Sequence, residues 1–112
     1  MRVSLVFPRT HYVSGDPPLG LAYVAAYARQ HVPGLEITIL DSTFDKGLGP
    51  ITERLRAFKP DLVGIFVDTL MYKNARELAA VAREAGAYVI AGGPHATVLP
   101  ESLKGFCDAV IQ

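Results

Sequence analysis

Two adjacent glycines, Gly92 and Gly93, open the segment Gly92-Gly93-Pro94-His95-Ala96-Thr97, which directly follows an apolar run. Because glycine has no Cβ, the pair allows positive φ angles or the close approach of a flat group to the main chain. A tight turn without any ligand explains the same pair equally well. The pair therefore marks a candidate binding position whose role depends on the loops beside it.

The segment 8–18, which follows the first apolar run, is a second candidate binding loop. It is longer than most connections between a strand and a helix, and long ordered loops often carry binding residues. The helix expected after it begins near Leu19-Gly20, where free backbone amides can meet a polar or anionic group. No G-x-G-x-x-G and no G-K-[ST] occurs, so the sequence does not support phosphate binding of the dinucleotide or P-loop type.

Asp68 ends the third apolar run, at the position where a receiver domain carries its phosphorylated aspartate. A receiver also needs carboxylates after its first strand to hold a magnesium ion. The corresponding position here reads Phe7-Pro8-Arg9. A receiver-like domain therefore remains an alternative that lacks its metal site.

The three histidines, His11, His31 and His95, share no short ligand spacing and have no cysteine companions, so we predict no metal cluster. His31 is expected at the end of a helix, where a cationic ring favours the helix dipole. Cys107 has no surrounding motif that would lower its pKa, and we interpret it as a packing residue. No nucleophile, base and orienting group can be assembled, so no residue is assigned as catalytic.

The 112 residues suit a single domain, and half of them are hydrophobic, which is typical of a globular protein. Eleven basic residues balance eleven acidic ones, which argues against nucleic acid and membrane surfaces as partners. The first apolar run is stopped by Pro8 and is too short for a signal peptide or a transmembrane helix. A single cysteine suits a reducing compartment, so we predict a cytoplasmic protein.

Five short apolar runs predict strands, and helical patterns separate the first four of them. The strands are expected at residues 3–7, 36–40, 61–67, 87–91 and 108–111. Single helices between strands imply right-handed crossovers and a doubly wound, five-stranded parallel sheet of the α/β class. Ligands bind such sheets at the carboxyl ends of the strands. The predicted functional edge comprises the loops after Phe7, Leu40, Val67 and Ala91.

Apolar periodicity indicates which helix faces lie on this sheet. The first helix, residues 18–31 with Asp16 as its cap, is expected to turn Leu19, Ala22, Tyr23 and Ala26 inward. The second is expected to turn Ile51, Leu55 and Phe58 inward. The third is expected to turn Ala75, Leu78, Ala79, Ala82 and Ala85 inward and to end at Gly86.

Four segments in order resemble the N-terminal cobalamin-binding domain of radical S-adenosylmethionine enzymes. They are Pro17-Pro18-Leu19-Gly20-Leu21-Ala22-Tyr23, Ile39-Leu40-Asp41, Pro60-Asp61-Leu62-Val63-Gly64-Ile65, and Gly92-Gly93-Pro94-His95-Ala96-Thr97 with Pro100-Glu101. The resemblance covers nearly the whole chain. It implies a flavodoxin-like (Rossmann-like) sheet that buries the nucleotide tail of cobalamin and leaves the corrin ring at the carboxyl edge.

The resemblance implies cobalamin contacts at Gly92 and Gly93 and a hydrogen bond between the tail and Thr69. Better-known cobalamin modules carry D-x-H-x-x-G after the first strand, with the histidine on cobalt. In this chain Arg9 replaces the aspartate and the glycine comes one place late, so His11 lacks its orienting partner. We expect base-off cobalamin without a histidine ligand. The residues expected around the cofactor are Pro8, Arg9, Thr10, His11, Leu19, Gly20, Asp68, Thr69, Leu70, Gly92, Gly93, Pro94 and His95.

In that family the domain continues into a barrel that binds S-adenosylmethionine and a [4Fe-4S] cluster through C-x-x-x-C-x-x-C. The resemblance implies that residues 1–112 are a cobalamin-binding domain cut off before this barrel, which would supply the methyltransferase or radical chemistry. The alternative is a cofactor-free structural or substrate-positioning domain of the same fold. An exposed last strand would also favour pairing of two copies into a homodimer.

Overall fold

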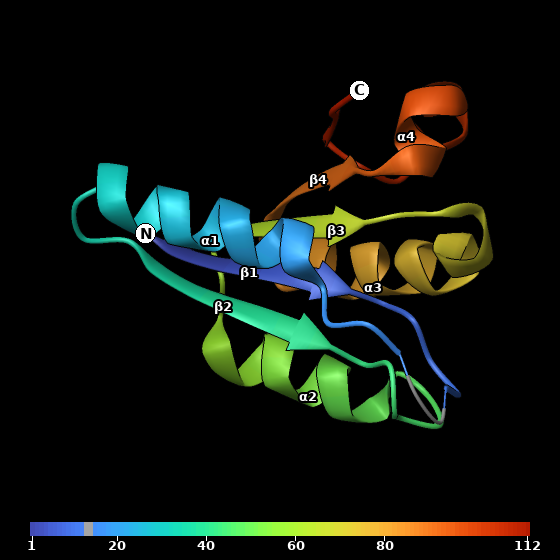
Figure 1. Cartoon of the computed structure of the whole chain (residues 1–112), viewed down its shortest axis with the longest axis horizontal. Coiled ribbons are helices and arrows are strands. Elements are labelled where there is room, and N and C mark those ends of the chain that lie inside the picture. Colours follow the sequence, from blue (N-terminus) through green and yellow to red (C-terminus); the bar gives the residue numbers. More distant parts are fainter. Residues whose placement is uncertain (13–14) are drawn as a thin grey trace.

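The computed structural model describes residues 1–12 and 15–112, and in these residues five parallel strands form one sheet in the order β2-β1-β3-β4-β5 (Figure 1). The strands are β1 (Arg2–Phe7), β2 (Glu36–Asp41), β3 (Leu62–Phe66), β4 (Tyr88–Gly92) and β5 (Ala109–Val110). This is the flavodoxin-like order, whose direction reverses between β1 and β3. The predicted doubly wound parallel sheet is confirmed.

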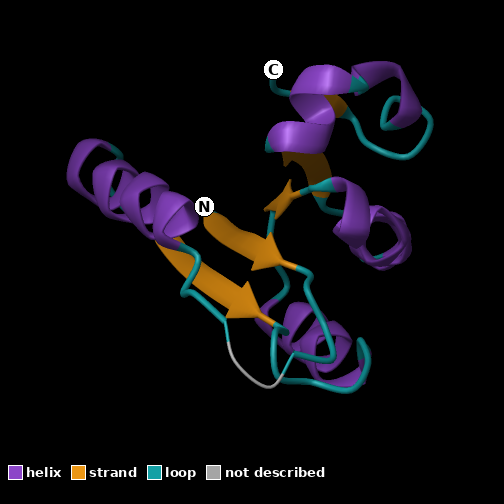
Figure 2. Cartoon of the chain, turned by 45° about the vertical axis from the view of Figure 1, so that its right-hand side comes forward, coloured by secondary structure: helices purple, strands orange, loops and turns teal. Residues whose placement is uncertain are grey.

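Helices cover the two faces of the sheet unequally. They are α1 (Leu19–His31), α2 (Gly49–Phe58), α3 (Tyr72–Glu84) and α4 (Pro94–Val98), with 3₁₀ turns η1 (Thr69–Met71) and η2 (Pro100–Ser102). α1 lies against β2 and β1 on one face, while α2 and α3 lie together on the other (Figure 2). The α1 face over β3 and β4 is left partly open.

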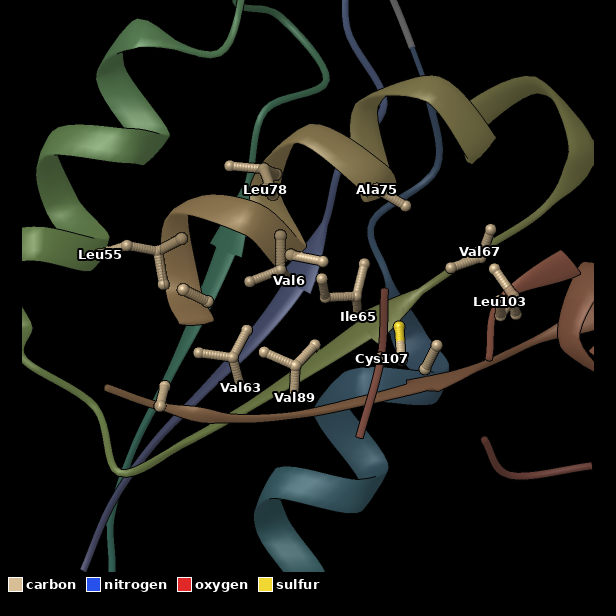
Figure 3. Packing of buried hydrophobic residues seen from close by; sticks show 14 of the residues in the cluster. Val6, Leu55, Val63, Ile65, Val67, Ala75, Leu78, Val89, Leu103 and Cys107 are labelled. Carbon is tan, nitrogen blue, oxygen red and sulfur yellow. The ribbon is translucent and has the colours of Figure 1, made fainter. Parts of the chain in front are cut away.

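The larger core cluster lies between the sheet and the pair α2–α3 (Figure 3). Val6, Val63 and Val89 from the three central strands are fully buried there against Leu55 of α2 and Leu78 of α3. The apolar stripes predicted for the second and third helices are confirmed, except that Phe58 is only partly buried and lies outside the core cluster, and Ala85 is exposed after the end of α3. Gly86 takes a φ of +90° directly after this helix, as its position predicted.

The prediction for the inward face of α1 is wrong. Leu19 and Tyr23 are 60% and 76% exposed, and Ala22 and Ala26 are exposed as well. The helix instead buries Ala25 fully and packs Leu21 and Ala28 against the sheet. Because α1 is apolar on nearly all sides, its periodicity does not distinguish the face that meets the sheet.

Asp16 does not cap α1, which is a second correction. The N-cap residue is Pro18, and no side chain of the described residues caps the first turn with a hydrogen bond. Two prolines separate Asp16 from the helix, so its carboxylate is too far back along the chain to reach the first amides. The Asp16 carbonyl oxygen instead accepts a hydrogen bond from Arg9 Nη2 at 3.0 Å.

In the described part of the chain, none of the helices has the length and apolar character needed to span a membrane.

Candidate functional site

An apolar groove of about 330 Å³ opens on the α1 face of the sheet, beside the first turns of α1. We call it the α1 groove. Its lining residues come from β1, α1, β3, β4 and the segment after β5: Leu5, Gly20, Leu21, Val24, Gly64, Ile65, Phe66, Ile90, Ala91, Gly92, Gly93 and Ile111. Almost all of the lining is hydrocarbon, which suits a flat apolar group rather than a phosphate or a metal ion.

Two rows of cross-strand neighbours form the floor of the α1 groove. Leu5, Gly64 and Ile90 lie side by side in the register of β1, β3 and β4. In the next row Phe66 lies beside Gly92. Each row contains one glycine where its neighbours carry large side chains, so the floor is hollowed at Gly64 and Gly92.

The two adjacent glycines have different roles. Gly93 takes a φ of +103°, and a Cβ there would come within 2.9 Å of the Val67 carbonyl oxygen. A glycine is therefore required at position 93 by the φ angle and by the close contact with the Val67 backbone. A Cβ on Gly92 would meet nothing closer than Ile111, at 3.9 Å, so its missing side chain leaves space open in the groove. Pro94 follows as the exposed first residue of α4.

The loop after β1 is tied to the neighbouring elements at the carboxyl edge. Asn74 of α3 donates through Nδ2 to the Pro8 carbonyl oxygen at 2.8 Å and to Thr10 Oγ1 at 3.1 Å. Arg9 donates to Thr43 Oγ1 at 3.3 Å, and its guanidinium lies 4.7 Å from the Tyr12 ring centroid. Val13 and Ser14, which belong to this predicted binding loop, lie outside the described residues.

His11 is exposed and takes a φ of +66°, a left-handed conformation that histidine adopts less readily than glycine. Its backbone amide donates to the Asp45 carbonyl oxygen at 2.9 Å, which joins the β1 loop to the loop after β2. The main chain of His11 is thus fixed while its ring faces solvent. His31 lies elsewhere, at the last residue of α1, where it stacks on Tyr27.

Asp68 and Leu70 belong to the loop after β3. Asp68 is the N-cap of η1 and accepts through Oδ1 from the Met71 backbone amide at 2.9 Å. Its carboxylate is therefore used in shaping the loop. Leu70 is 83% exposed and, with Arg9, Thr10 and Asp68, borders a small polar hollow of about 100 Å³. Among the described residues no three His, Cys, Asp or Glu side chains are grouped to hold a metal ion.

Thr69 and His95 connect the loop after β3 to the loop after β4. Thr69 Oγ1 lies 3.2 Å from His95 Nδ1, and Ser102 Oγ lies 2.8 Å from His95 Nε2. Thr69 is exposed, whereas His95 is only 7% exposed. The two predicted site residues are therefore brought together, but only the threonine is open to a ligand.

Leu19 and Gly20 begin α1 at the mouth of the α1 groove. The Leu19 amide is not free, because it donates to the Pro17 carbonyl oxygen at 2.8 Å. Gly20 lines the groove, and a Cβ there would meet none of the described residues within 4 Å. The start of α1 thus forms one side of the α1 groove without filling it. The expectation of a free amide at Leu19 is wrong.

Cys107 is buried in the cluster between the sheet and α3, as its interpretation as a packing residue predicted. Burial, reinforced by the nearby Asp108 carboxylate, raises the pKa of its thiol from 9.0 to about 11. The thiol is therefore protonated at neutral pH. It lies on the α2–α3 face, away from the floor of the α1 groove.

Several groove residues were not predicted as site residues, among them Leu5, Gly64, Val24 and Ile111. Gly64 could have been recognised from the sequence, since a glycine inside an otherwise apolar strand often marks a site where a ligand or another backbone comes close to the main chain. The others are ordinary apolar residues, and only the fold shows which of them leave a face uncovered. A broader hollow on the outer side of α1 is lined by that helix alone, from Tyr23 to Gln30.

The chain matches a known family over most of its length. A sequence model described as the B12 binding domain matches residues 11–112. The uncharacterized methyltransferase PH0819 of Pyrococcus horikoshii is 32% identical over 124 residues, an alignment that covers all of this chain and 26% of that protein. The chain thus spans about a quarter of the length of this curated relative.

Solved structures share the fold. The radical S-adenosylmethionine methyltransferase TsrM from Kitasatospora setae, solved with cobalamin and a [4Fe-4S] cluster, matches with a TM-score of 0.73 and 24% identity over 94% of this chain and 22% of its own. A cobalamin-binding protein from Desulfitobacterium hafniense matches with a TM-score of 0.66 and 20% identity over 99% of this chain and 52% of its own.

Proposed function

The chain belongs to the B12-binding domain family, and we propose that it holds cobalamin with the nucleotide tail in the α1 groove and the corrin ring over the carboxyl edge of the sheet. The observation that carries this placement is the hollow at Gly64 and Gly92, which a Cβ at either position would begin to fill. A flat, apolar base fits between the two rows of side chains and the wall formed by α1.

The size of the α1 groove favours the tail over the whole cofactor. Pockets for drug-sized ligands measure about 300–1,000 Å³. At about 330 Å³ the groove accommodates one part of a molecule as large as cobalamin. The corrin ring would then lie outside it, near the loops that carry Arg9, Thr69 and Pro94.

A base held in the α1 groove is removed from cobalt, so we propose that the cofactor is bound base-off. We propose no histidine of this chain as a ligand of cobalt. His11 has Arg9 where an orienting aspartate would stand, and a metal-bound histidine normally has such a partner. When bound, cobalamin supplies a cobalt centre that can carry a methyl group. The visible spectrum of the bound cofactor distinguishes base-off from base-on cobalamin.

We further propose that residues 1–112 are one domain of a longer polypeptide with a radical S-adenosylmethionine barrel. The support is the coverage of the relatives, since the chain spans 26% of PH0819 and 22% of TsrM. S-adenosylmethionine and the [4Fe-4S] cluster would be bound by that barrel. The reading frame downstream of residue 112 tests the proposal: a C-x-x-x-C-x-x-C motif supports it, and a stop codon or an unrelated domain contradicts it.

Cobalamin retention tests the proposed function directly. The purified chain is mixed with hydroxocobalamin, passed through gel filtration and assayed for cofactor by its visible absorbance. We expect the folded chain to retain the cofactor, and the variant Gly105→Ala to retain it equally, since Gly105 has open space around it and lies between the core residues Leu103 and Cys107. A folded chain that emerges without cofactor would support the cofactor-free structural domain instead.

A further inference from the structure

His95 is buried at the carboxyl edge with both ring nitrogens engaged. Nδ1 lies 3.2 Å from Thr69 Oγ1, and Nε2 lies 2.8 Å from Ser102 Oγ. The Tyr72 ring packs on the imidazole with its centroid 4.9 Å away, and Tyr72 Oη donates to the Ser102 carbonyl oxygen at 2.9 Å. The ring is therefore held in one orientation by contacts from α3 and η2.

The hydroxyl of Ser102 determines which nitrogen of His95 carries the proton. Ser102 Oγ also lies 2.7 Å from the Leu99 carbonyl oxygen, which can only accept a hydrogen bond. The single hydroxyl proton of Ser102 is thus donated to Leu99, and its oxygen must accept from His95. The neutral ring that satisfies this arrangement is protonated at Nε2.

The assignment at Nε2 fixes the direction of the bond on the other side of the ring. With its proton on Nε2, the neutral imidazole has a bare lone pair at Nδ1. Thr69 must then donate its hydroxyl proton to Nδ1. The exposed side of Thr69 Oγ1 is left with lone pairs only, so it can accept a hydrogen bond from a ligand but not donate one.

We propose that His95 is a positioning residue that sets Thr69 as a hydrogen-bond acceptor and so selects a donor group on the bound cofactor. Amide side chains of the corrin ring and hydroxyls of the ribose are such donors, whereas the ring nitrogen of the free base is an acceptor. The inference rests on the proposed cobalamin site. It assigns His95 an indirect role, in place of the direct cofactor contact expected from its position in the loop.

The tautomer is tested on the chain without cofactor. Long-range proton–nitrogen NMR spectra of histidine-labelled protein distinguish an imidazole protonated at Nε2 from one protonated at Nδ1. We expect the Nε2 form for His95 in the wild type and a larger share of the Nδ1 form in Ser102→Ala, where the acceptor for Nε2–H is removed. A wild-type ring protonated at Nδ1 overturns the inference, whatever the outcome for cobalamin.

Cobalamin affinity tests the consequence for Thr69. The side chain of His95→Gln keeps a donor near the position of Nε2 but loses the acceptor at Nδ1, while His95→Asn places an amide oxygen near the position of Nδ1. We expect His95→Gln and Thr69→Val each to weaken binding about 2–10-fold, as for one hydrogen bond. The double variant should be no weaker than either single one, and His95→Asn should stay near wild type.

Two results separate failure of this inference from failure of the proposed function. Full affinity in His95→Gln together with a loss in Thr69→Val, or additive losses in the double variant, contradicts the positioning role while leaving the cobalamin site intact. A wild type that binds no hydroxocobalamin contradicts the proposed function and the ligand-selecting part of the inference together. The tautomer measured without cofactor then still decides how the Thr69 hydroxyl is oriented.

Discussion

Leu5 and Gly64 are direct neighbours across β1 and β3, and a Cβ on Gly64 would come within 2.9 Å of Leu5 Cδ2. The leucine therefore occupies part of the space that the glycine leaves free, and the remainder belongs to the α1 groove. The depth of the groove depends on this pair, since Gly64 is the one residue of the row Leu5, Gly64 and Ile90 that has no side chain.

Gly64→Ala is predicted to reduce both stability and cobalamin binding. The new methyl group must displace Leu5 Cδ2, the end of a side chain that borders the α1 groove and can turn aside, so we expect a loss of no more than about 1 kcal/mol in the free energy of unfolding. Urea unfolding measures this loss. Because Leu5→Val removes the displaced atom, the double variant should lose less stability than the sum of the two single variants. Simple additivity would show that the two residues do not share the space.

Gly93→Ala is predicted to destabilise the chain even without a ligand. The residue has φ +103° and ψ −175°, a region that essentially only glycine adopts, and its Cβ would meet the Val67 carbonyl oxygen. We expect a loss of about 1–3 kcal/mol or more in the free energy of unfolding. Gly92→Ala is the matched control and should unfold within about 0.5 kcal/mol of wild type. Equal losses in both variants would contradict the separate roles of the two glycines.

The glycine pair is evident in the sequence, but the different roles of its two members are not. Of the two features expected of the pair, the positive φ is found at Gly93, whereas Gly92 leaves open space in the α1 groove, where we propose that a flat group binds. Which glycine takes which role depends on Val67, whose carbonyl oxygen lies against Gly93 in the folded chain. That neighbour directly follows β3, far from Gly93 in the sequence, so no local pattern reveals it.

Asn74→Ala is predicted to loosen the loop after β1. The change removes the donor to the Pro8 carbonyl oxygen and to Thr10 Oγ1, and leaving a buried carbonyl without this donor costs about 1–3 kcal/mol. Hydrogen exchange should accelerate at Arg9, Thr10 and His11 before it does in β1. Lys73→Ala, at the exposed neighbouring position, is the control and should leave exchange unchanged. Unchanged exchange in Asn74→Ala would show that α3 does not hold the loop.

Cys107 is predicted to make the chain less stable as the pH rises from 9 to 11. The folded thiol has a pKa of about 11 against 9.0 when unfolded, so the folded state holds its proton more tightly. The stabilisation is complete below pH 9 and is lost as the unfolded thiol ionises. Unfolding of wild type and Cys107→Ala is compared across this range, and the gap between them should change only above pH 9. A constant gap would contradict the raised pKa.

The order of β1 to β4 and α1 to α3 was predictable because each of these elements is long enough to show its own period, whereas α4 spans only five residues and was not predicted. The orientation of α1 was not, since Leu19, Tyr23 and Tyr27 on its outer side are as apolar as Leu21 and Ala25 on its inner side. The α1 groove was missed for a related reason. It exists because one part of a sheet face is left uncovered, which is a property of how elements are arranged rather than of any residue in them.

Comparing cobalamin with cobinamide, which lacks the nucleotide tail, tests the central claim most directly. Dissociation constants of both are measured for the wild type and for Gly92→Val, whose added methyl groups would project into the α1 groove beside Ile111. We predict that the wild type binds cobalamin at least about 10-fold more tightly than cobinamide and that Gly92→Val removes this difference without unfolding the chain. Equal affinity of the wild type for both corrinoids, or a preference for cobalamin that persists in Gly92→Val, would contradict a tail held in the α1 groove.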